Sequence, residues 1–318
     1  MSIPVNISGS RSAAVLGLSE YQSQVSVWLE IMESREPGFC DKNGYLYQPF
    51  AGNAATDFGT AFEDSIIELT EMHCGGKVIS RQKYYESGYM TCHLDGEIFD
   101  DTIVEAKTTA YYSYVNNWGE PNGDRVPRSY QIQANHNMML AGRNHCIMPV
   151  LVFPRRQEEM AEAGIDVTSV DTFKWASVLN EMGYLKFYHI TANPELQSLM
   201  LAHYADFWNR YVIGRTEPPV RDYDDIKKLC RAPRGTIIAD EFIERQLSEY
   251  DQITAEINEM TRRKDQIKTI AVEYMREQAS SDGVAIDDDS AEKFILRSRD
   301  GKKLASYGKD KQGRLIFR

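Results

Sequence analysis

The chain has 318 residues, of which 42% are hydrophobic, enough for one large domain or two modest domains with a buried core. A formal net charge of −11 at pH 7 argues against a protein that coats nucleic acid over its whole surface, although a basic channel can coexist with an acidic exterior. Five cysteines without a Cys-x-x-Cys pair or a secretory leader, and no apolar run of membrane-spanning length, predict a soluble cytoplasmic protein with reduced thiols.

The first half of the chain predicts a mixed sheet flanked by helices. Thr56 is expected to cap a helix that runs to about His73 and ends at Gly75. Pro127 and Gly142 are expected to start and end a second helix. Strands are expected around that helix, the last in a central position because it is uniformly apolar, at residues 77–85, 89–94, 102–107 and 146–153.

The second half predicts a short continuation of the core and then an extension. A strand at 184–190 and a helix that begins at Asn193 are expected to complete the core. Apolar residues then recur in steps of three and four from Tyr250 to Tyr274, which is the heptad pattern of a self-associating helix or of an arm on the core. The expected domains are a core, a linker, a long charged helix, and a flexible linker with a small β-hairpin, at residues 1–214, 215–237, 238–279 and 280–318.

Three polar residues on two expected strands point to chemistry. Side chains of a strand alternate between faces, so Glu105 and Lys107 project to the same side while Ala106 packs underneath. Asp95 ends the preceding strand, and the turn through Gly96 and Asp100-Asp101 is expected to bring it within reach of Glu105. Two carboxylates suit Mg²⁺ or Mn²⁺, and a lysine beside them can orient or help to deprotonate a water that attacks a phosphodiester. The pattern therefore predicts a metal-dependent nuclease.

Taken alone, this spacing is a weak signal, because an alternating Glu-x-Lys is usually a solvated strand face. Two further blocks strengthen it. Glu63 lies upstream in the first expected helix, one turn after Gly59, which is expected to leave room for close approach of a metal or backbone. Downstream, Tyr130, Gln133 and Asn137 share a face of the second helix. His136 is expected to be a packed or hydrogen-bonded group rather than a metal ligand.

The segment from Ile7 to Tyr21 has the pattern S-x-x-A-x-x-L-G-x-S-x-Y. With the blocks above, it resembles the YqaJ-like viral recombinase family, which includes phage lambda exonuclease, of the PD-(D/E)XK nuclease superfamily. The resemblance extends to about Phe153. It implies an α/β fold with a mixed sheet and a restriction-endonuclease-like core, followed here by a helical heptad and β-hairpin extension.

The resemblance also implies roles for individual residues. The implied ligands of Mg²⁺ or Mn²⁺ are Asp95, Glu105, the carbonyl of Ala106 and, as an additional carboxylate, Glu63. Lys107 is the implied catalytic lysine, and the residues implied to support the scissile phosphate or the attacking water are Gln133 and Tyr130.

Recognition of a DNA end is expected to differ from the family pattern. Members that digest duplex ends carry an arginine just before the opening motif, and residues 3–6 have none, so Ser10 and Arg11 are the candidates for contact with a terminal phosphate. His93 replaces a small polar residue that can contact phosphate in a relative. Arg128 belongs to a group of arginines near the Gln133 helix. The candidate DNA contacts are therefore Ser10, Arg11, His93 and Arg128.

The first functional hypothesis is a Mg²⁺-dependent exonuclease that digests linear duplex DNA, 5′ to 3′, and leaves single strands for a phage annealing protein. Relatives act as closed oligomers around DNA, so a homo-oligomeric ring in a bacterial cytoplasm, encoded by a phage or prophage, is expected. The alternative is a single-strand or end-processing nuclease of the helicase- or CRISPR-associated type. A third hypothesis, a non-catalytic scaffold for DNA ends or a recombinase, is opposed by the intact acidic pair and lysine.

Overall fold

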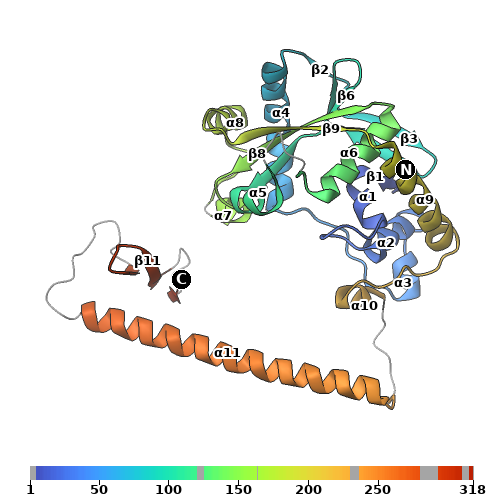
Figure 1. The fold of residues 1–318 in the computed structure, drawn as a ribbon. Helices are drawn as coiled ribbons and strands as arrows, with labels where there is room; N and C mark the ends of the chain where they lie inside the picture. The colour runs from blue at the N-terminus through green and yellow to red at the C-terminus, as the bar shows by residue number, and fades with distance from the viewer. Residues whose placement is uncertain are drawn as a thin grey trace. The chain divides into compact units, whose positions relative to one another are not determined.

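The computed structural model describes residues 5–119, 125–162, 164–229, 236–279, 293–309 and 315–317. The chain forms two compact units, Met1–Pro233 and Arg234–Arg318 (Figure 1). Within the described ranges, no helix is both long enough and apolar enough to span a bilayer.

The helices and strands have the following bounds. The helices are α1 Gly9–Val15, α2 Gln24–Arg35, α3 Phe39–Asn43, α4 Ala54–Cys74, α5 Tyr111–Asn117, α6 Arg128–Ala141, α7 Gln157–Glu162, α8 Thr172–Glu181, α9 Pro194–Phe207, the π-helix η1 Trp208–Ile213, α10 Tyr223–Leu229 and α11 Glu241–Ala279. The strands are β1 Ile7–Ser8, β2 Val78–Ile79, β3 Lys83–Ser87, β4 Met90–Leu94, β5 Gly96–Ile98, β6 Thr102–Val104, β7 Lys107–Ala110, β8 His145–Phe153, β9 Leu185–Thr191, β10 Lys293–Arg297, β11 Lys303–Lys309 and β12 Leu315–Phe317.

The main sheet contains one strand that is interrupted in the middle. β6 and β7 both pair in parallel with β8 at the same register, since Val104 lies opposite Ile147 and Lys107 lies opposite Val150. They are therefore two halves of one strand along the same edge of β8, and β9 pairs antiparallel along the other edge. The sheet runs from β2 through β5 to the interrupted strand, then to β8 and β9. The parallel and antiparallel pairs make it a mixed sheet.

Two helices cover opposite faces of this sheet (Figure 1). On one face, the ring of Phe153 in β8 contacts Phe58 and Phe62 of α4 edge-on, at centroid distances of 5.3 and 5.1 Å. On the other face, Val150 packs in a cluster with Met138 of α6. Burial on both faces explains why β8 is apolar throughout. The expected α/β fold class is thus confirmed, with the central strand where the sequence predicted it.

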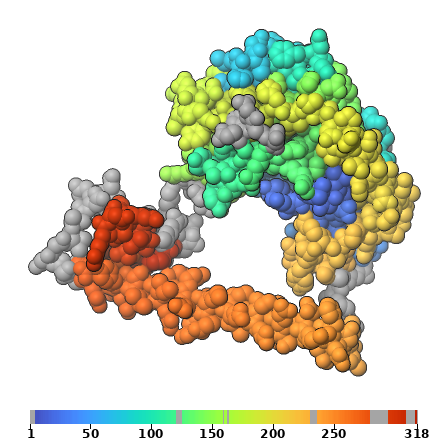
Figure 2. Space-filling view, viewed as in Figure 1, coloured from blue at the N-terminus to red at the C-terminus, as the bar shows by residue number. Residues whose placement is uncertain are grey.

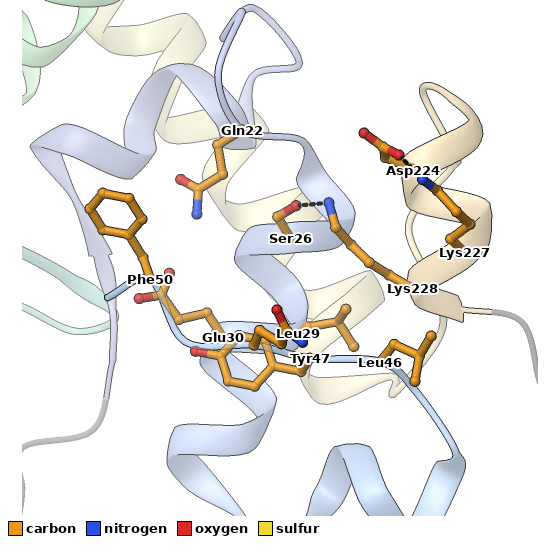
Figure 3. A pocket seen from close by; sticks show the side chains of 11 residues that line it. Gln22, Ser26, Leu29, Glu30, Leu46, Tyr47, Phe50, Asp224, Lys227 and Lys228 are labelled. Carbon is orange, nitrogen blue, oxygen red and sulfur yellow. Dashed lines mark hydrogen bonds and ion pairs between the residues drawn. The ribbon is translucent and has the colours of Figure 1, made fainter. Parts of the chain in front are cut away.

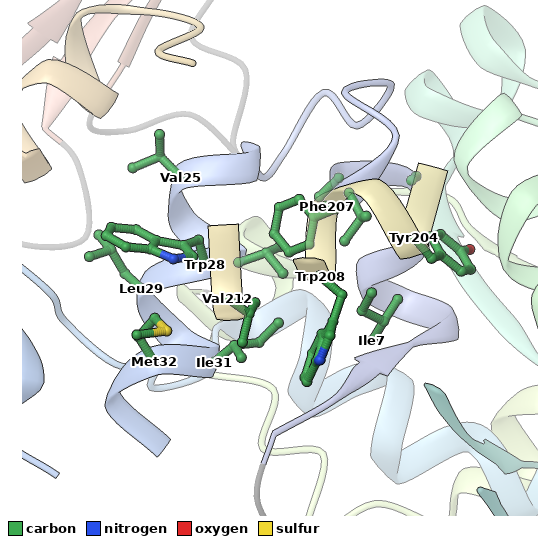
Figure 4. Close-up of a cluster of buried hydrophobic side chains, with 14 of the residues drawn as sticks. Ile7, Val25, Trp28, Leu29, Ile31, Met32, Tyr204, Phe207, Trp208 and Val212 are labelled. Atoms are coloured by element: carbon green, nitrogen blue, oxygen red, sulfur yellow. The ribbon is translucent and has the colours of Figure 1, made fainter. Parts of the chain in front are cut away.

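A second core lies where α1 and α2 meet α9 and η1 (Figure 4). The indole of Trp28 in α2 is fully buried, and its N–H donates to the carbonyl of Tyr211 at 2.8 Å. Ile7 of β1 and Phe207 at the end of α9 pack into the same cluster. β1 also pairs in parallel with β4. This core therefore holds the opening motif of the chain beside the strands and the α6 helix of the first unit.

Several local features differ from the sequence-based expectations. The N-cap of α4 is Asn53 and not Thr56, which is the third residue of the helix. Asn53 and Thr56 form a reciprocal capping box. The expected strand at 77–85 is two strands, β2 and β3, because Ser80 and Gln82 adopt positive φ angles of 54° and 53° between them. A helix, α5, occupies the start of the connection after β7.

The segment expected to be a linker contains a packed helix. Asp225 of α10 is fully buried and accepts hydrogen bonds from the Ser23 hydroxyl and, at 2.9 Å, from the Arg221 amide. Ser23 is also the N-cap of α2, so one serine joins the start of α2 to α10. The residues at 280–292, expected to be flexible, lie outside the described residues.

His136 of α6 ties this helix to the second core. Its Nε2 lies 2.9 Å from the Thr91 carbonyl and therefore carries the proton, while Nδ1 lies 3.2 Å from the Tyr204 hydroxyl and accepts from it. The ring is 0% exposed. His136 is therefore a packed, hydrogen-bonded group, as the sequence suggested.

Burial lowers the pKa of His136 to about 4, which predicts a loss of stability in acid. In the unfolded chain, the histidine binds a proton near pH 6.5. Proton binding therefore stabilises the unfolded state relative to the folded state as pH falls below 6.5, until the folded protein also binds the proton near pH 4. The free energy of unfolding should fall by about 3 kcal/mol over this pH range. Urea unfolding between pH 7 and pH 4 measures it. His136→Gln should flatten the slope, whereas replacement of the exposed His189 should not; equal slopes for both variants would contradict the prediction.

The second unit consists of α11 and a small antiparallel sheet in the order β10, β11, β12 (Figures 1 and 2). α11 has 39 residues. The apolar residues of its heptad seam are exposed: Tyr250, Ile253, Ile257, Met260, Ile267 and Tyr274. Only near its C-terminal end, at Met275, is a side chain of α11 buried among the described residues.

Candidate active site

The candidate site is built at the interruption between β6 and β7. The amide of Glu105 donates to the Ile147 carbonyl at 3.0 Å. In a parallel ladder the Glu105 carbonyl would next accept from the amide of residue 149, but that residue is Pro149, which has no N–H. The regular pairing stops there. On the opposite edge, the Ala106 amide donates to Oδ2 of Asp95 at 2.8 Å.

The position of Asp95 follows from the end of β5. β5 pairs antiparallel with β6, with Gly96 opposite Val104, so the residue before Gly96 lies beside the interruption. A side chain at Gly96 would collide with Val78, since a Cβ there would lie 2.1 Å from its Cγ1. Glycine at position 96 therefore lets β2 pack closely against β5, next to the residue whose carboxylate accepts the hydrogen bond from the Ala106 amide.

The carboxylate of Glu105 collects three side-chain donors. It is 2% exposed. Its Oε1 accepts from Lys107 Nζ and from Gln133 Nε2, each at 2.6 Å, and its Oε2 accepts from Asn137 Nδ2 at 2.8 Å. The strand supplies the acid and the lysine, and α6 supplies both amides. The predicted alternation, with Glu105 and Lys107 on one face and Ala106 packed on the other, is present.

Lys107 is held as an ammonium between carboxylates and an aromatic ring. Burial alone would lower its pKa, but Glu105 and then Asp95 outweigh burial, so the pKa of Lys107 is raised. The Nζ atom also lies 5.3 Å from the centre of the Tyr130 ring, within range of a cation–π contact. Tyr130 itself stacks on the buried Trp118 at 5.4 Å. The ammonium is thus fixed beside the two acids.

Asp95 and Glu63 carry the remaining negative charge of the site. Burial raises the pKa of Asp95, and the nearby Glu105 carboxylate raises it further. Burial likewise raises the pKa of Glu63, whose Oε1 accepts from Gln82 Nε2 at 2.7 Å. Glu63 lies on α4, the helix that covers the sheet face opposite α6. It interacts electrostatically with Asp95 and Glu105 but has no hydrogen bond to either among the described contacts.

Gly59 does not have the steric role that the sequence suggested. A Cβ at this position would meet only Thr108 Oγ1, at 3.7 Å, which is an ordinary van der Waals contact. An alanine would fit, so the close approach of a metal or of backbone does not require glycine there.

Among the described contacts, none of the four residues expected to contact DNA has a hydrogen bond to this cluster. Arg11 already donates to both carboxylate oxygens of Glu30 and, at 2.9 Å, to the Ser8 hydroxyl. Ser10 is exposed next to it. His93 is exposed on β4 and lies against the Tyr84 ring at 4.8 Å. Arg128 is exposed at the first residue of α6 and lines a groove of about 450 Å³ together with Tyr21, Tyr130 and Arg125, among other residues.

A separate pocket of about 490 Å³ lies between α2, the segment around Tyr47 and α10 (Figure 3). Its two lysines are already paired: Lys228 donates to the Ser26 hydroxyl at 2.8 Å, and Lys227 forms an ion pair with Asp224. No residue of the Glu105 cluster lines it. The chemistry is therefore concentrated at the strand interruption rather than in this pocket.

Asn137 is the member of the cluster that the sequence reading did not assign. It lies one helical turn after Gln133, on the same face of α6. The sequence pattern places Asn137 on this face but gives it no role; its spacing from Gln133 is the signal for one, because the next turn of the helix faces the same glutamate. It is 2% exposed.

The donor set suits a divalent cation of the Mg²⁺ or Mn²⁺ type. Within the described residues, no group of three or more His, Cys, Asp or Glu side chains is arranged to hold a metal ion. Mg²⁺ commonly binds through only one or two protein carboxylates, keeping waters and substrate phosphates as its other ligands. Asp95 and Glu105 are two adjacent acids with a single lysine between them, so their charge is incompletely balanced.

Comparison with known proteins shows what part of the chain is similar to. Residues 4–144 match the family described as the YqaJ-like viral recombinase domain. A comparison with curated proteins gave no match. An alkaline exonuclease from Laribacter hongkongensis superposes with a TM-score of 0.48 at 14% identity, covering 66% of this chain and 89% of that one. A phage-related exonuclease from Haemophilus somnus 129PT gives a TM-score of 0.42 at 15% identity, covering 67% and 98%. Residues 4–144, which are less than half of the chain, are therefore similar to the YqaJ-like viral recombinase domain.

Proposed function

We propose that the protein is a Mg²⁺- or Mn²⁺-dependent exonuclease that digests linear duplex DNA, 5′ to 3′, and leaves single strands for recombination or for a single-strand annealing protein. The observation that carries the proposal is the convergence of Lys107, Gln133 and Asn137 on the buried Glu105, beside Asp95 at the strand interruption. The family match adds a viral recombinase context, which suits a phage or prophage gene expressed in a bacterial cytoplasm.

Each group has a task in phosphodiester hydrolysis. A divalent ion held by Asp95, Glu105 and the Ala106 carbonyl, with Glu63 nearby, would lower the pKa of a bound water and polarise the phosphate. The Lys107 ammonium balances negative charge that builds on the phosphate as the water oxygen attacks phosphorus. Gln133, whose Nε2 is 2.6 Å from Glu105, keeps that carboxylate oriented, and Tyr130 holds the ammonium from the other side.

The direct test is digestion of end-labelled linear duplex and of closed circular duplex, with Mg²⁺ and with EDTA. The expected result is release of label from linear DNA only when the ion is present, and no loss of circular DNA. Labels at the 5′ and 3′ ends separate the two polarities. Cleavage of the circle at the same rate would reject an exonuclease, and undiminished cleavage in EDTA would reject the metal-dependent mechanism.

A second candidate is a single-strand or end-processing nuclease. The pairing of Arg11 with Glu30 favours it, because the guanidinium that was expected to hold a terminal phosphate is already occupied. Comparison of 5′-phosphorylated with 5′-hydroxyl duplex decides between the two. A strong preference for the phosphorylated end supports the first function; equal rates, together with faster digestion of single strands, support the second.

We further propose that the chain self-associates through α11, consistent with the homo-oligomer that the resemblance implies. Glu256 and Arg263 flank the exposed seam at equivalent heptad positions, so in an antiparallel pair each Glu256 faces Arg263 of the second copy. A parallel pair would instead place two copies of Lys264 opposite each other and bring Arg263 close to Lys268. An antiparallel pair has twofold symmetry, so it would join two chains or two rings.

Light scattering after size-exclusion chromatography tests this pairing. Arg263→Glu should shift the chain toward lower mass, because it faces Glu256 of the second copy, and Glu256→Arg in the same chain should restore the assembly. Arg262, which pairs with Glu259 of its own helix, supplies the control, since Arg262→Glu should leave the mass unchanged. A wild-type mass of one chain at micromolar concentration, or no effect of Arg263→Glu, would reject the proposal.

A further inference from the structure

Asn137 is a buried side chain, and among the described residues only one of its two polar atoms has a hydrogen-bond partner. Its Nδ2 donates to Glu105 Oε2 at 2.8 Å. Its Oδ1 is buried and has no hydrogen-bond partner among the described residues. An unpaired buried acceptor lowers stability, so this amide is not explained by its contribution to folding. Its one hydrogen bond goes to the central carboxylate of the site.

Gly9, the first residue of α1, lies directly against the unpaired oxygen. A Cβ at Gly9 would lie 2.4 Å from Asn137 Oδ1, 3.1 Å from its Cγ and 3.2 Å from Gln133 Cγ. Real Cβ atoms do not approach other atoms as closely as the first of these distances, so any other residue at this position would displace the Asn137 amide and crowd the Gln133 side chain. Gly9 is itself buried and in a helix, so its value here is the space that it leaves rather than an unusual φ angle.

The contact joins two parts of the chain that are far apart in sequence. α1 belongs to the opening motif and packs in the second core with Trp28, whereas Glu105 lies in the main sheet. α6 lies between them and presents Gln133 and Asn137 to the carboxylate. The position of α1 therefore sets how closely these two amides approach Glu105.

We propose that Asn137, held by the close approach of Gly9, is a positioning residue that fixes the second oxygen of Glu105 for metal binding and hydrolysis. The inference rests on the proposed nuclease function. Lys107 and Gln133 both act on Oε1, so Asn137 is the side chain that prevents rotation of the carboxylate about its last bond. The opening motif of the chain thus acts on the active site through packing as well as through any contact with DNA.

The test uses the full-length chain, linear duplex DNA and titration with Mn²⁺ or Mg²⁺. Asn137→Ala should lower kcat about tenfold to a hundredfold and raise the metal concentration for half-maximal rate, with little change in the KM for DNA. Asn135 supplies a matched control: it lies on the same helix, is also buried, and bonds to Gln131 and Asn193 rather than to Glu105. Asn135→Ala should reduce thermal stability without moving the metal dependence.

Gly9→Ala adds a second, independent measurement. Alone it should reproduce the loss caused by Asn137→Ala, because the new methyl group displaces the amide. In the Asn137→Ala background, where that amide is absent, Gly9→Ala should lower kcat much less than it does in the wild-type background. Gly59→Ala is the matched control, since its methyl group would make only an ordinary contact.

The outcomes separate this inference from the proposed function. If the wild-type chain digests no DNA under any of these conditions, the nuclease assignment fails. If the wild type is active but Asn137→Ala leaves kcat and the metal dependence unchanged, or if the two losses are simply additive, the positioning role of Asn137 and Gly9 is wrong. A fall in thermal stability with an unchanged metal dependence would also reject it.

Discussion

Replacing Lys107 with alanine is expected to reduce DNA cleavage by about a thousandfold while leaving DNA affinity nearly unchanged. The Lys107 ammonium lies 2.6 Å from Glu105 at the strand interruption. In the proposed mechanism its loss would remove the charge that balances the phosphate during attack. It contributes little to binding, because it is 15% exposed and paired with protein carboxylates. Single-turnover cleavage measures the rate, and fluorescence anisotropy in Ca²⁺ measures the affinity.

Two further variants make the result interpretable. Lys107→Met keeps the aliphatic stem and should be as inactive as the alanine variant, which separates loss of charge from loss of packing. Lys186 on β9 lies opposite Val150, as Lys107 does on β7, so it is a lysine in the same row of the sheet without a contact to Glu105. Lys186→Ala should cleave at a rate close to that of the wild type. Equal Mg²⁺-dependent digestion by Lys107→Ala would overturn the catalytic assignment.

The sequence predicts the centre of this site well because strand geometry has a strict period. Glu105 and Lys107 are two residues apart, so their side chains share a face regardless of the rest of the fold. The turn at residues 99–101 pairs β5 with β6, and this pairing places Asp95, the residue before Gly96, beside the interruption. These three positions depend on local geometry and on one antiparallel pairing, and the structure brings them together as expected.

Features that depend on contacts between distant segments were not accessible in the same way. Pro149 interrupts a ladder 44 residues after Glu105 in the chain, and this effect appears only when the register of β8 is known. The Arg11–Glu30 pair and the contact of Gly9 with Asn137 likewise join separate helices. In each case the residue types are ordinary, and only tertiary packing gives them a role.

The helical differences have a more local cause. Thr56 was a reasonable cap by residue type, but Asn53 is an equally good one, and the reciprocal bond between them places the start of α4 at the earlier residue. α5 contains three tyrosines and three polar residues, a composition without a helical apolar stripe, and none of its residues is buried. α10 is held by the buried Asp225, which a sequence of charged residues after two prolines does not reveal.

Asp95→Asn is expected to abolish cleavage and, without added metal, to raise the melting temperature. The asparagine oxygen can still accept the hydrogen bond from the Ala106 amide, so the local structure should be preserved. The substitution removes a mostly buried charge that burial and the neighbouring Glu105 both disfavour, as the raised pKa of Asp95 indicates. Each kcal/mol of repulsion removed should raise the melting temperature by about 2–4 °C.

With Mn²⁺ or Mg²⁺ added, the wild type should melt at a higher temperature than the Asp95→Asn variant, which reverses their order in the absence of metal. A ligand that binds only the folded state stabilises it in proportion to its binding, so the wild type should gain stability with metal, while the Asp95→Asn chain should gain much less. Differential scanning calorimetry with EDTA and then with increasing metal provides both measurements on the same samples. If the variant melts lower than the wild type in EDTA, or shows the same stabilisation by metal, then Asp95 is a structural cap on the Ala106 amide and not a ligand. If Asp95 instead lowers stability without metal and is needed for both the metal response and cleavage, then it is present for catalysis and not for folding.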